Sequence, residues 1–329
     1  MKKLVEWGNV LLCLVLLNGC AAPEYAAFTE QYRRQFRDAN PHVVRAAMRS
    51  DGLKASAREF GAANKNRAPT IVMMHGFPDS QHLYDSVIPP LAKTRHVITF
   101  DFLGWGDSDK PAGHKHDVSS LRRDLEAVVS AFDLRSVVLV VHDLSGQPGI
   151  DWALDNEERV SALVLLNTYY LSMAGLRPPE AIARFSTPGP WRDLSVWAAN
   201  RNDAMWQRGV EEQIRKFFAS QSARDTFVGV FVHQALGIRP AFFGQNAVLR
   251  DEITRRDQVA PRLKQFRKPV RIIFGADDPY LNQSVANEFH RLFPMSDLFL
   301  IGKAAHYVQL DQPAQVAELI LTSGRALTK

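Results

Sequence analysis

The chain of 329 residues contains 46% hydrophobic and 23% charged residues, and its 40 Lys and Arg against 35 Asp and Glu give a formal net charge of +5. This composition excludes a disordered or collagen-like chain, and without a dense Lys/Arg run it gives no reason to expect nucleic-acid binding. The two cysteines, Cys13 and Cys20, lie near the N-terminus, so the rest of the chain can hold neither a disulfide framework nor a Cys-ligated zinc site.

The first twenty residues have the organisation of an export signal. Two lysines precede a compact apolar run at residues 10–17, which is too short to span a bilayer as a helix. The following Leu17-Asn18-Gly19-Cys20 resembles the lipobox of bacterial lipoproteins. The resemblance implies a signal peptide at residues 1–19, acylation of Cys20, and a lipid anchor in the bacterial cell envelope, on the periplasmic side of the outer membrane. An ordinary secretory peptide or an uncut buried helix are the alternatives.

Residues 20–50 are expected to comprise the anchor and a helical tether to the core. The segment from Glu24 to Ser50 is charged and carries apolar residues at roughly helical spacing: Phe28, Tyr32, Phe36, Val43, Val44 and Met48. It offers no residues with an evident chemical role.

From about residue 53 onward, short apolar runs alternate with amphipathic stretches. The runs cover residues 70–74, 96–100, 136–141, 162–166, 270–274 and 298–301. Continuous apolar runs are typical of strands buried on both faces, as in a parallel sheet covered by helices. The stretches between them, such as residues 119–132 and 313–321, predict helices and therefore an α/β fold with right-handed crossovers. Ligands bind at the carboxyl ends of the strands in such sheets, where polar residues follow most of these runs.

The alternation stops between residues 169 and 255. This segment has a helical composition and no buried-strand run, and it contains several Phe and the tryptophans Trp191, Trp197 and Trp206. An insertion of this size after one strand predicts a helical cap over the sheet edge. Most of its aromatic side chains are expected to pack helix on helix, with a few lining a pocket beneath the cap.

The segment VVLVVHDLSGQPGIDWAL predicts a strand, a tight turn and a helix, which is the setting of a nucleophile elbow. Such a turn needs small residues two before, two after and three after the nucleophile. Around Asp143 these positions hold Val141, Ser145 and Gly146, of which two are small. Around Ser145 they hold Asp143, Gln147 and Pro148, none of which fits well. The turn therefore favours Asp143, with Ser145 as the alternative.

Four motifs together resemble the α/β-hydrolase family over residues 53–325, nearest to its aspartate-nucleophile branch of epoxide hydrolases and haloalkane dehalogenases. They are His75-Gly76-Phe77-Pro78, the run from Asp101 to Pro111, the elbow at His142-Asp143, and the late pair formed by Gly275-Ala276-Asp277-Asp278 with His306. The resemblance implies a mostly parallel sheet flanked by helices, with core segments at residues 51–168 and 256–329 and the cap at 169–255.

The resemblance also implies that Asp278 is the acid and His306 the histidine of a catalytic triad with Asp143, in the chain order that this fold requires. Asp277 is the rival acid, with a turn residue as its ordinary role. His75 is expected to order its loop, His142 to pack beside the elbow, and Asp101 to shape the turn after its strand.

An ionised carboxylate needs no base to attack an sp³ carbon, and His306 would then activate water against the resulting Asp143 ester. The fold places the oxyanion N–H donors at Phe77 and Leu144. An opening epoxide also wants a proton donor, for which Tyr169 and Tyr170 are the candidates. The leading hypothesis is therefore an epoxide hydrolase-like enzyme acting on a small apolar substrate.

Three alternatives stay open. A haloalkane dehalogenase would need side-chain N–H donors for the departing halide. The positions that customarily hold the donors Trp and Asn in such enzymes hold Leu144 and Phe77 here, so only the cap tryptophans could donate to the halide. A serine-type carboxylesterase would use Ser145. A lipid-anchored binding protein would use the fold without catalysis. No sequence motif for a cofactor or a metal is present, so neither is expected.

Overall fold

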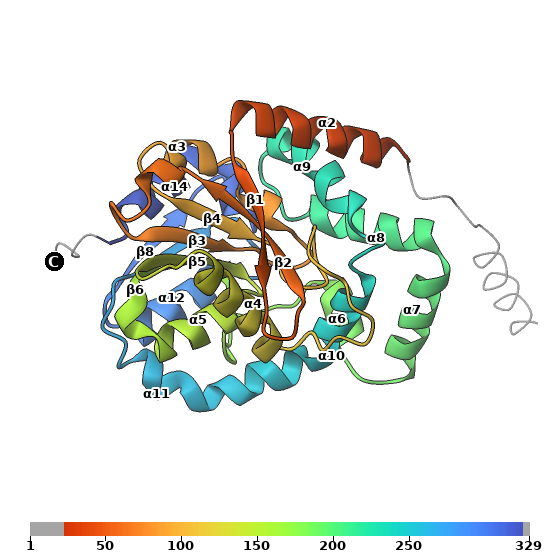
Figure 1. The fold of residues 1–329 in the computed structure, drawn as a ribbon. Coiled ribbons are helices and arrows are strands. Elements are labelled where there is room, and N and C mark those ends of the chain that lie inside the picture. The colour runs from red at the N-terminus through yellow and green to blue at the C-terminus, as the bar shows by residue number, and fades with distance from the viewer. Residues whose placement is uncertain (1–22, 325–329) are drawn as a thin grey trace, which may run out of the picture.

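The structure, a computed structural model, describes residues 23–324 and consists of one eight-stranded sheet covered by helices (Figure 1). The predicted signal peptide and the acylation site Cys20 lie outside the described residues. The strands are β1 Val43–Met48, β2 Lys54–Phe60, β3 Thr70–Met74, β4 Val97–Phe100, β5 Val137–Asp143, β6 Val160–Thr168, β7 Val270–Gly275 and β8 Ser296–Ile301.

The sheet has the strand order β1-β2-β4-β3-β5-β6-β7-β8. Only β1 and β2 are antiparallel to their neighbours, and all pairs from β4 to β8 are parallel. The six predicted strands all form, and the prediction of a mostly parallel α/β sheet is confirmed. The five central strands from β4 to β7 are buried along almost their whole length, because helices cover both faces.

Helices pack on the two faces of the sheet and leave the carboxyl ends of the parallel strands facing the cap. α4 and α5 pack together against one face and α12 lies against β7 and β8, whereas α3 and α14 contact each other across the opposite face (Figure 1). The α-helices of the core, including the short helices α11 and α13, are α3 Ile88–Ala92, α4 Val118–Ala131, α5 Gly146–Asp155, α11 Ala260–Leu263, α12 Gln283–Leu292, α13 Val308–Asp311 and α14 Pro313–Thr322.

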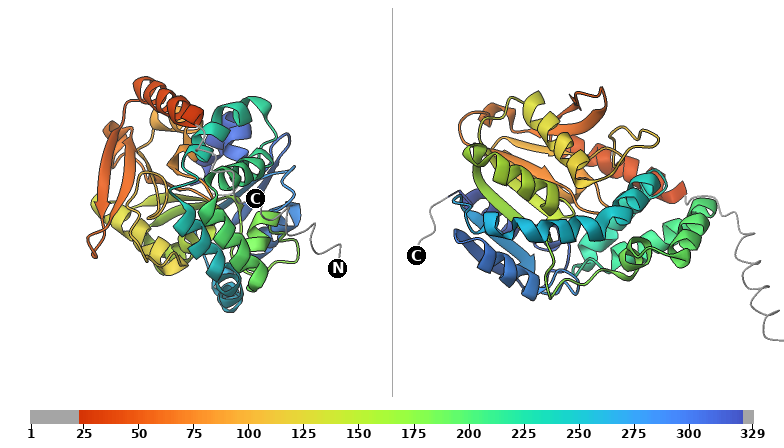
Figure 2. Two further views of the ribbon diagram at one scale, coloured as in Figure 1. Left: turned by 90° about the vertical axis from the view of Figure 1, so that its right-hand side faces the viewer. Right: turned by 90° about the horizontal axis from the view of Figure 1, so that it is seen from below.

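The segment between β6 and α11 contains helices and no strand, and it forms the cap. Its helices are α6 Glu180–Ser186, α7 Pro190–Arg201, α8 Asp203–Arg215, α9 Gln221–His233 and α10 Arg239–Arg256. The right-hand view of Figure 2 shows these helices projecting beyond the sheet on one side, with the long α10 leading back to the core. Across residues 23–324, no helix is both long and apolar enough to span a membrane.

The N-terminal segment is helical only in its first half. α2 Pro23–Ala39 is a helix as expected, but the prediction is wrong for residues 43–48, which form edge strand β1. Apolar residues there pair in antiparallel register with β2, and helical spacing over so few residues does not distinguish the two structures. α2 packs along α9 of the cap, and Arg33 pairs with Asp107 of the core, so that α2 touches both parts (Figure 2).

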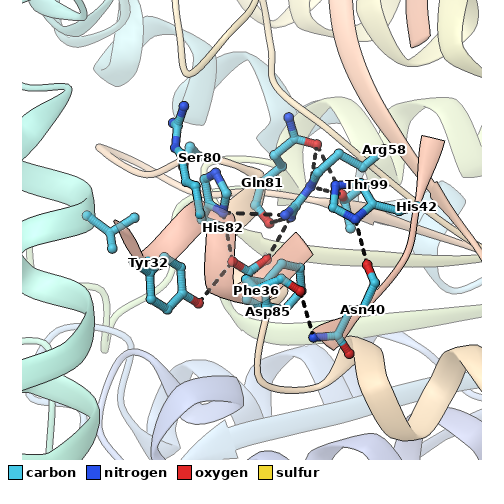
Figure 3. A network of polar contacts seen from close by, with 12 residues as sticks. Tyr32, Phe36, Asn40, His42, Arg58, Ser80, Gln81, His82, Asp85 and Thr99 are labelled. Carbon is cyan, nitrogen blue, oxygen red and sulfur yellow. Dashed lines mark hydrogen bonds and ion pairs between the residues drawn. The ribbon is translucent and has the colours of Figure 1, made fainter. Parts of the chain in front are cut away.

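A buried polar network fastens α2 to the core (Figure 3). The carboxylate of Asp85 accepts hydrogen bonds from the Arg58 guanidinium at 2.8 Å and the Tyr32 hydroxyl at 3.0 Å, and it contacts His82 Nδ1 at 2.7 Å. Arg58 and Asp85 are 4% and 2% exposed, so each needs the other as a counter-ion. His82 belongs to the short helix Gln81–Tyr84, which follows the loop after β3, so the network ties that loop to α2.

Candidate active site

Asp143 occupies the turn between β5 and α5 with a positive φ of 49°. Asp tolerates this left-handed conformation better than most residues, and such strain is often found at functional sites. The Thr168 hydroxyl donates to the Asp143 carbonyl at 2.6 Å and holds the turn. A Cβ on Gly146 would lie 2.0 Å from the Thr168 hydroxyl oxygen, so this position must be glycine. The close approach of helix and strand expected for an elbow therefore exists around Asp143.

Two backbone N–H groups converge on the Asp143 side chain. The Phe77 N–H donates to Oδ2 at 3.1 Å, and the Leu144 N–H also bonds this carboxylate. The Phe77 loop can come this close because a Cβ on Gly76 would meet the Asp143 Cβ at 2.8 Å. The predicted oxyanion donors thus both contact the Asp143 carboxylate.

His306 and Asp278 lie next to each other at the ends of the neighbouring segments. His306 Nδ1 lies 2.9 Å from Asp278 Oδ2. The other Asp278 oxygen accepts the backbone N–H groups of Tyr280 and Leu281. Asn167 Nδ2 donates to Asp278 Oδ2 at 2.9 Å. These contacts fix the carboxylate and, through it, orient the imidazole.

The charges of these groups perturb one another. Burial raises the pKa of Asp143 to about 6, although His306 and the N–H groups of Leu144 and Phe77 lower it. Burial alone would lower the pKa of His306, but Asp278 first, and then Asp143 and Asp79, raise it to about 9. The pKa of Asp278 is lowered, because the charge and hydrogen bond of His306 outweigh the effect of burial. An imidazolium between carboxylates is therefore the resting arrangement at neutral pH.

The two rival residues are placed differently. Ser145 is fully buried, and its hydroxyl lies 2.8 Å from each of three backbone groups: the His142 N–H and the carbonyls of His142 and Met74. It does not line the cavity next to His306, which argues against the serine alternative. Asp277 is exposed, and its backbone N–H bonds the Ala304 carbonyl, whereas Asp278 meets His306.

His75 and Asp101 organise loops, as expected. His75 Nδ1 lies 2.8 Å from the Gly76 carbonyl oxygen, and its Nε2 accepts the Phe102 N–H at 3.1 Å. The Asp101 carboxylate accepts the backbone N–H and side-chain amide of Gln81. His142 is buried against the His306 ring, with Nε2 3.0 Å from the His306 carbonyl oxygen.

The two candidate proton donors, Tyr169 and Tyr170, follow β6 and lie in different surroundings. Tyr169 lines the catalytic cavity, and the nearby charge of Asp143, added to burial, holds the pKa of its hydroxyl far above the usual value, so that it stays protonated. Tyr170 instead donates to Asp151 at 2.6 Å and lies under Arg256, away from the cavity. The expectation for Tyr170 is therefore not met, because successive side chains leaving a strand point in opposite directions.

A cavity of about 240 Å³, hereafter the catalytic chamber, contains Asp143, Tyr169 and His306 in its wall. Most of its remaining lining is apolar and comes from the cap and the adjoining loops. None of the three cap tryptophans lines the chamber. Trp206 donates its indole N–H to the Ala235 carbonyl at 2.7 Å, and Trp191 and Trp197 are exposed on α7.

Three further groups at the site were missed by the sequence analysis. Asn167 follows the apolar run 162–166, and its side chain bridges Asp278 and the Gly275 N–H. Asp79, whose pKa burial raises to about 7, accepts the Tyr307 hydroxyl at 2.5 Å behind His306. Their position at or just after strand ends was the available signal.

Comparison with known proteins gives a consistent result. The family described as alpha/beta hydrolase fold matches residues 69–313. A haloalkane dehalogenase of Sphingobium indicum is 32% identical over 311 residues, covering 84% of this chain and 95% of the relative. A cis-3-alkyl-4-alkyloxetan-2-one decarboxylase of Shewanella oneidensis is 32% identical over 276 residues, covering 80% and 84%. The crystal structure of the haloalkane dehalogenase DatA from Agrobacterium tumefaciens superimposes with a TM-score of 0.70 at 21% identity, covering 85% of this chain and 94% of that one.

Proposed function

This chain belongs to the alpha/beta hydrolase fold family, and we propose that it hydrolyses a substrate with a small strained ring that contains oxygen. The leading candidate is an epoxide, which would form an ester with Asp143 as the intermediate. The observation that carries the proposal is the placement of the Asp143 carboxylate. Its Oδ2 already accepts the Phe77 N–H, the Leu144 N–H also bonds the carboxylate, and the residue lines the chamber together with His306. A serine nucleophile has no oxygen to place there before it has reacted.

In the first step, Asp143 Oδ1 attacks a ring carbon of the epoxide and the carbon–oxygen bond of the ring breaks. The electron pair of that bond goes to the leaving oxygen, which takes a proton from the Tyr169 hydroxyl. The product is an alkyl ester of Asp143. The Tyr169 phenolate then takes a proton from the His306 imidazolium, which leaves the imidazole neutral for the second step. Tyr169 suits this role because it lines the chamber and its hydroxyl stays protonated.

In the second step, water attacks the ester carbonyl carbon of Asp143 while His306 accepts a proton from that water. The tetrahedral oxyanion forms at Oδ2, which accepts the Phe77 N–H, while the Leu144 N–H donates to the same carboxyl group. Donors of this kind typically stabilise such an intermediate by about 2.7–4 kcal/mol each. Collapse of the intermediate breaks the bond between the carbonyl carbon and Oδ1, and the departing alkoxide takes the proton of the newly formed Asp143 carboxyl group to give the diol. The carboxylate then carries one oxygen from water.

One of the relatives supports a strained oxygen ring as the substrate class. The name of the Shewanella oneidensis relative specifies an oxetan-2-one, a four-membered ring with a ring oxygen and alkyl substituents. An epoxide is the three-membered counterpart, and both rings lose strain when a carbon–oxygen bond breaks.

A single-turnover reaction in heavy-oxygen water tests the mechanism. With enzyme in excess over 1,2-epoxyhexane, we expect the label in the peptide that contains Asp143, measured by mass spectrometry after proteolysis. His306→Gln should accumulate the ester, visible as a mass increase equal to that of the epoxide, and Asp143→Asn should form none. Label found only in the diol would overturn the proposal.

A second candidate, haloalkane dehalogenase, is favoured by the Sphingobium indicum relative. The chamber lacks tryptophan among its described lining residues, which weakens this candidate because a departing halide needs such N–H donors. Halide release from 1-bromohexane, compared with diol formation from 1,2-epoxyhexane under the same conditions, separates the two activities. A faster bromoalkane reaction would favour the dehalogenase.

We also propose that Cys20 carries a lipid anchor in the bacterial envelope, which rests on the lipobox resemblance of residues 17–20. Metabolic labelling with an alkyne fatty acid should mark the full-length protein, and Cys20→Ser should not be marked. Absence of label from the unsubstituted protein would contradict the anchor.

A further inference from the structure

A second cavity lies next to the catalytic chamber within the cap. Its volume is about 830 Å³, more than three times that of the chamber at about 240 Å³. Helices α6, α7 and α8 supply most of its wall, and Phe242 of α10 adds to it. The two cavities share three lining residues, Phe77, Ile182 and Phe217, which form the boundary between them. The larger cavity therefore lies directly beside the space in which the chemistry is proposed to occur.

The inner wall of this second cavity presents carbon atoms. Phe185, Trp206 and Phe242 contact one another edge to face, with ring centroids 4.9–6.1 Å apart. The indole N–H of Trp206 is already bonded to a backbone carbonyl, so its ring offers the cavity an apolar surface. A polar ligand would find few partners here, whereas an apolar ligand would remove this surface from water.

The outer wall opens toward solvent. Leu194 and Trp197 of α7 and Met205 of α8 line the cavity and are 43%, 44% and 40% exposed. Arg201 stacks on Trp197 with its guanidinium 4.6 Å from the ring centroid. The charged lining residues Arg184, Asp193 and Arg201 are all exposed, so charge is found on the solvent side of the cavity. A ligand longer than the cavity can therefore project out between these side chains instead of being rejected.

We infer that the second cavity binds an unbranched alkyl chain of the substrate, so that the proposed epoxide is a long-chain alkyl epoxide whose ring lies at Asp143 and whose tail lies in the cap. The inference rests on the proposed function for the ring and on the second cavity for the tail. A ligand that extends from one cavity to the other passes between Phe77, Ile182 and Phe217.

A chain-length series of 1,2-epoxyalkanes tests the inference. The kcat/KM should rise from the four-carbon to the twelve-carbon epoxide by up to about fourfold per added methylene, the factor expected for each buried CH₂. It should then level off for longer chains, because the outer wall is open. Equal kcat/KM values for the two epoxides would overturn the inference.

Gly209 of α8 allows the cavity to be filled without disturbing the fold. It is exposed, it lines the second cavity but not the chamber, and a Cβ built on it meets nothing within 4 Å. Gly209→Phe should lower the ratio of kcat/KM for the twelve-carbon over the four-carbon epoxide at least tenfold. Glu212→Phe adds the same ring to the same helix outside the cavity lining and should leave the ratio as it is. A ratio unchanged in Gly209→Phe would overturn the inference.

A binding measurement separates this inference from the proposed reaction. Dodecane-1,2-diol, kept below its micelle-forming concentration, should bind the unsubstituted enzyme in calorimetric titration, and Gly209→Phe should weaken its affinity at least tenfold. Butane-1,2-diol should bind far more weakly to both. Binding of the long diol without turnover of any epoxide would reject the proposed function and keep the alkyl-chain site. Equal affinity for both diols would reject the site.

Discussion

The charge on Asp143 sets the pH range in which the first step can proceed. Burial raises the pKa of this carboxyl group from 3.8 to about 6. Only the ionised carboxylate attacks, so the reactive fraction is lost as the pH falls through about 6. At one pH unit below the pKa, about a tenth of the enzyme remains ionised. We therefore expect kcat/KM to fall about tenfold between neutral pH and about pH 5, whereas a carboxyl group with the usual pKa would lose almost nothing.

This acidic limb of the pH–rate profile is measured from initial rates of diol formation at epoxide concentrations well below KM. Under these conditions the rate depends on kcat/KM, whose pH dependence reports the pKa values of the free enzyme. His306→Gln provides the internal check, with ester formation followed by mass spectrometry in single turnover. The positive charge of His306 lowers the pKa of Asp143, so its removal should move the limb to higher pH. The reasoning is refuted if the apparent pKa of the acidic limb lies below about pH 5 in the unsubstituted enzyme. It is also refuted if this apparent pKa moves to lower pH in His306→Gln.

Three further substitutions probe the surroundings of the site. Asn167→Ala removes a hydrogen bond to the Asp278 carboxylate, and a hydrogen bond to a charged group contributes about 1.5–3 kcal/mol. We therefore expect kcat to fall about 10- to 100-fold with little change in KM. An unchanged kcat would show that Asn167 has no positioning role. Asp85→Ala leaves buried Arg58 without a counter-ion and should lower the free energy of unfolding by about 3–5 kcal/mol in urea titration; a loss below about 1 kcal/mol would contradict the assigned network. Ser145→Ala should cost about 1–3 kcal/mol of stability and retain epoxide turnover, and an inactive but folded variant would favour the serine route.

The fold could be predicted because its central strands are buried on both faces. Such strands must be apolar throughout, as in β5 Val137–Asp143, and their ends are marked by abrupt changes to polar residues. The first strand of the sheet lacks this signal. Residues 43–48 form an edge strand with only Ala47 buried, so their apolar spacing remained ambiguous and was read as a helix.

The site could be predicted only as far as local sterics and chain order reach. The tight turn favours Asp143 over Ser145 as the proposed nucleophile because the flanking positions must be small, a requirement that follows from a few neighbouring residues. The contact of Asn167 with Asp278 joins positions 111 residues apart and depends on the lateral order of β6 and β7. Tyr169 and Tyr170 are equivalent in sequence, and only the exact end of β6 decides which of them faces Asp143.

The charge of the nucleophile also determines when the base becomes available. Before reaction, Asp143 is one of the carboxylates that raise the pKa of His306 to about 9, so the ring is protonated and in turn stabilises the ionised nucleophile. Ester formation removes that negative charge, and the pKa of His306 must then fall while Asp278 continues to orient the ring. The neutral imidazole is thus favoured in the one state in which water has to be activated. A serine nucleophile, uncharged before attack, would not couple the two steps in this way, so the order of the proposed reaction follows from the carboxylate itself.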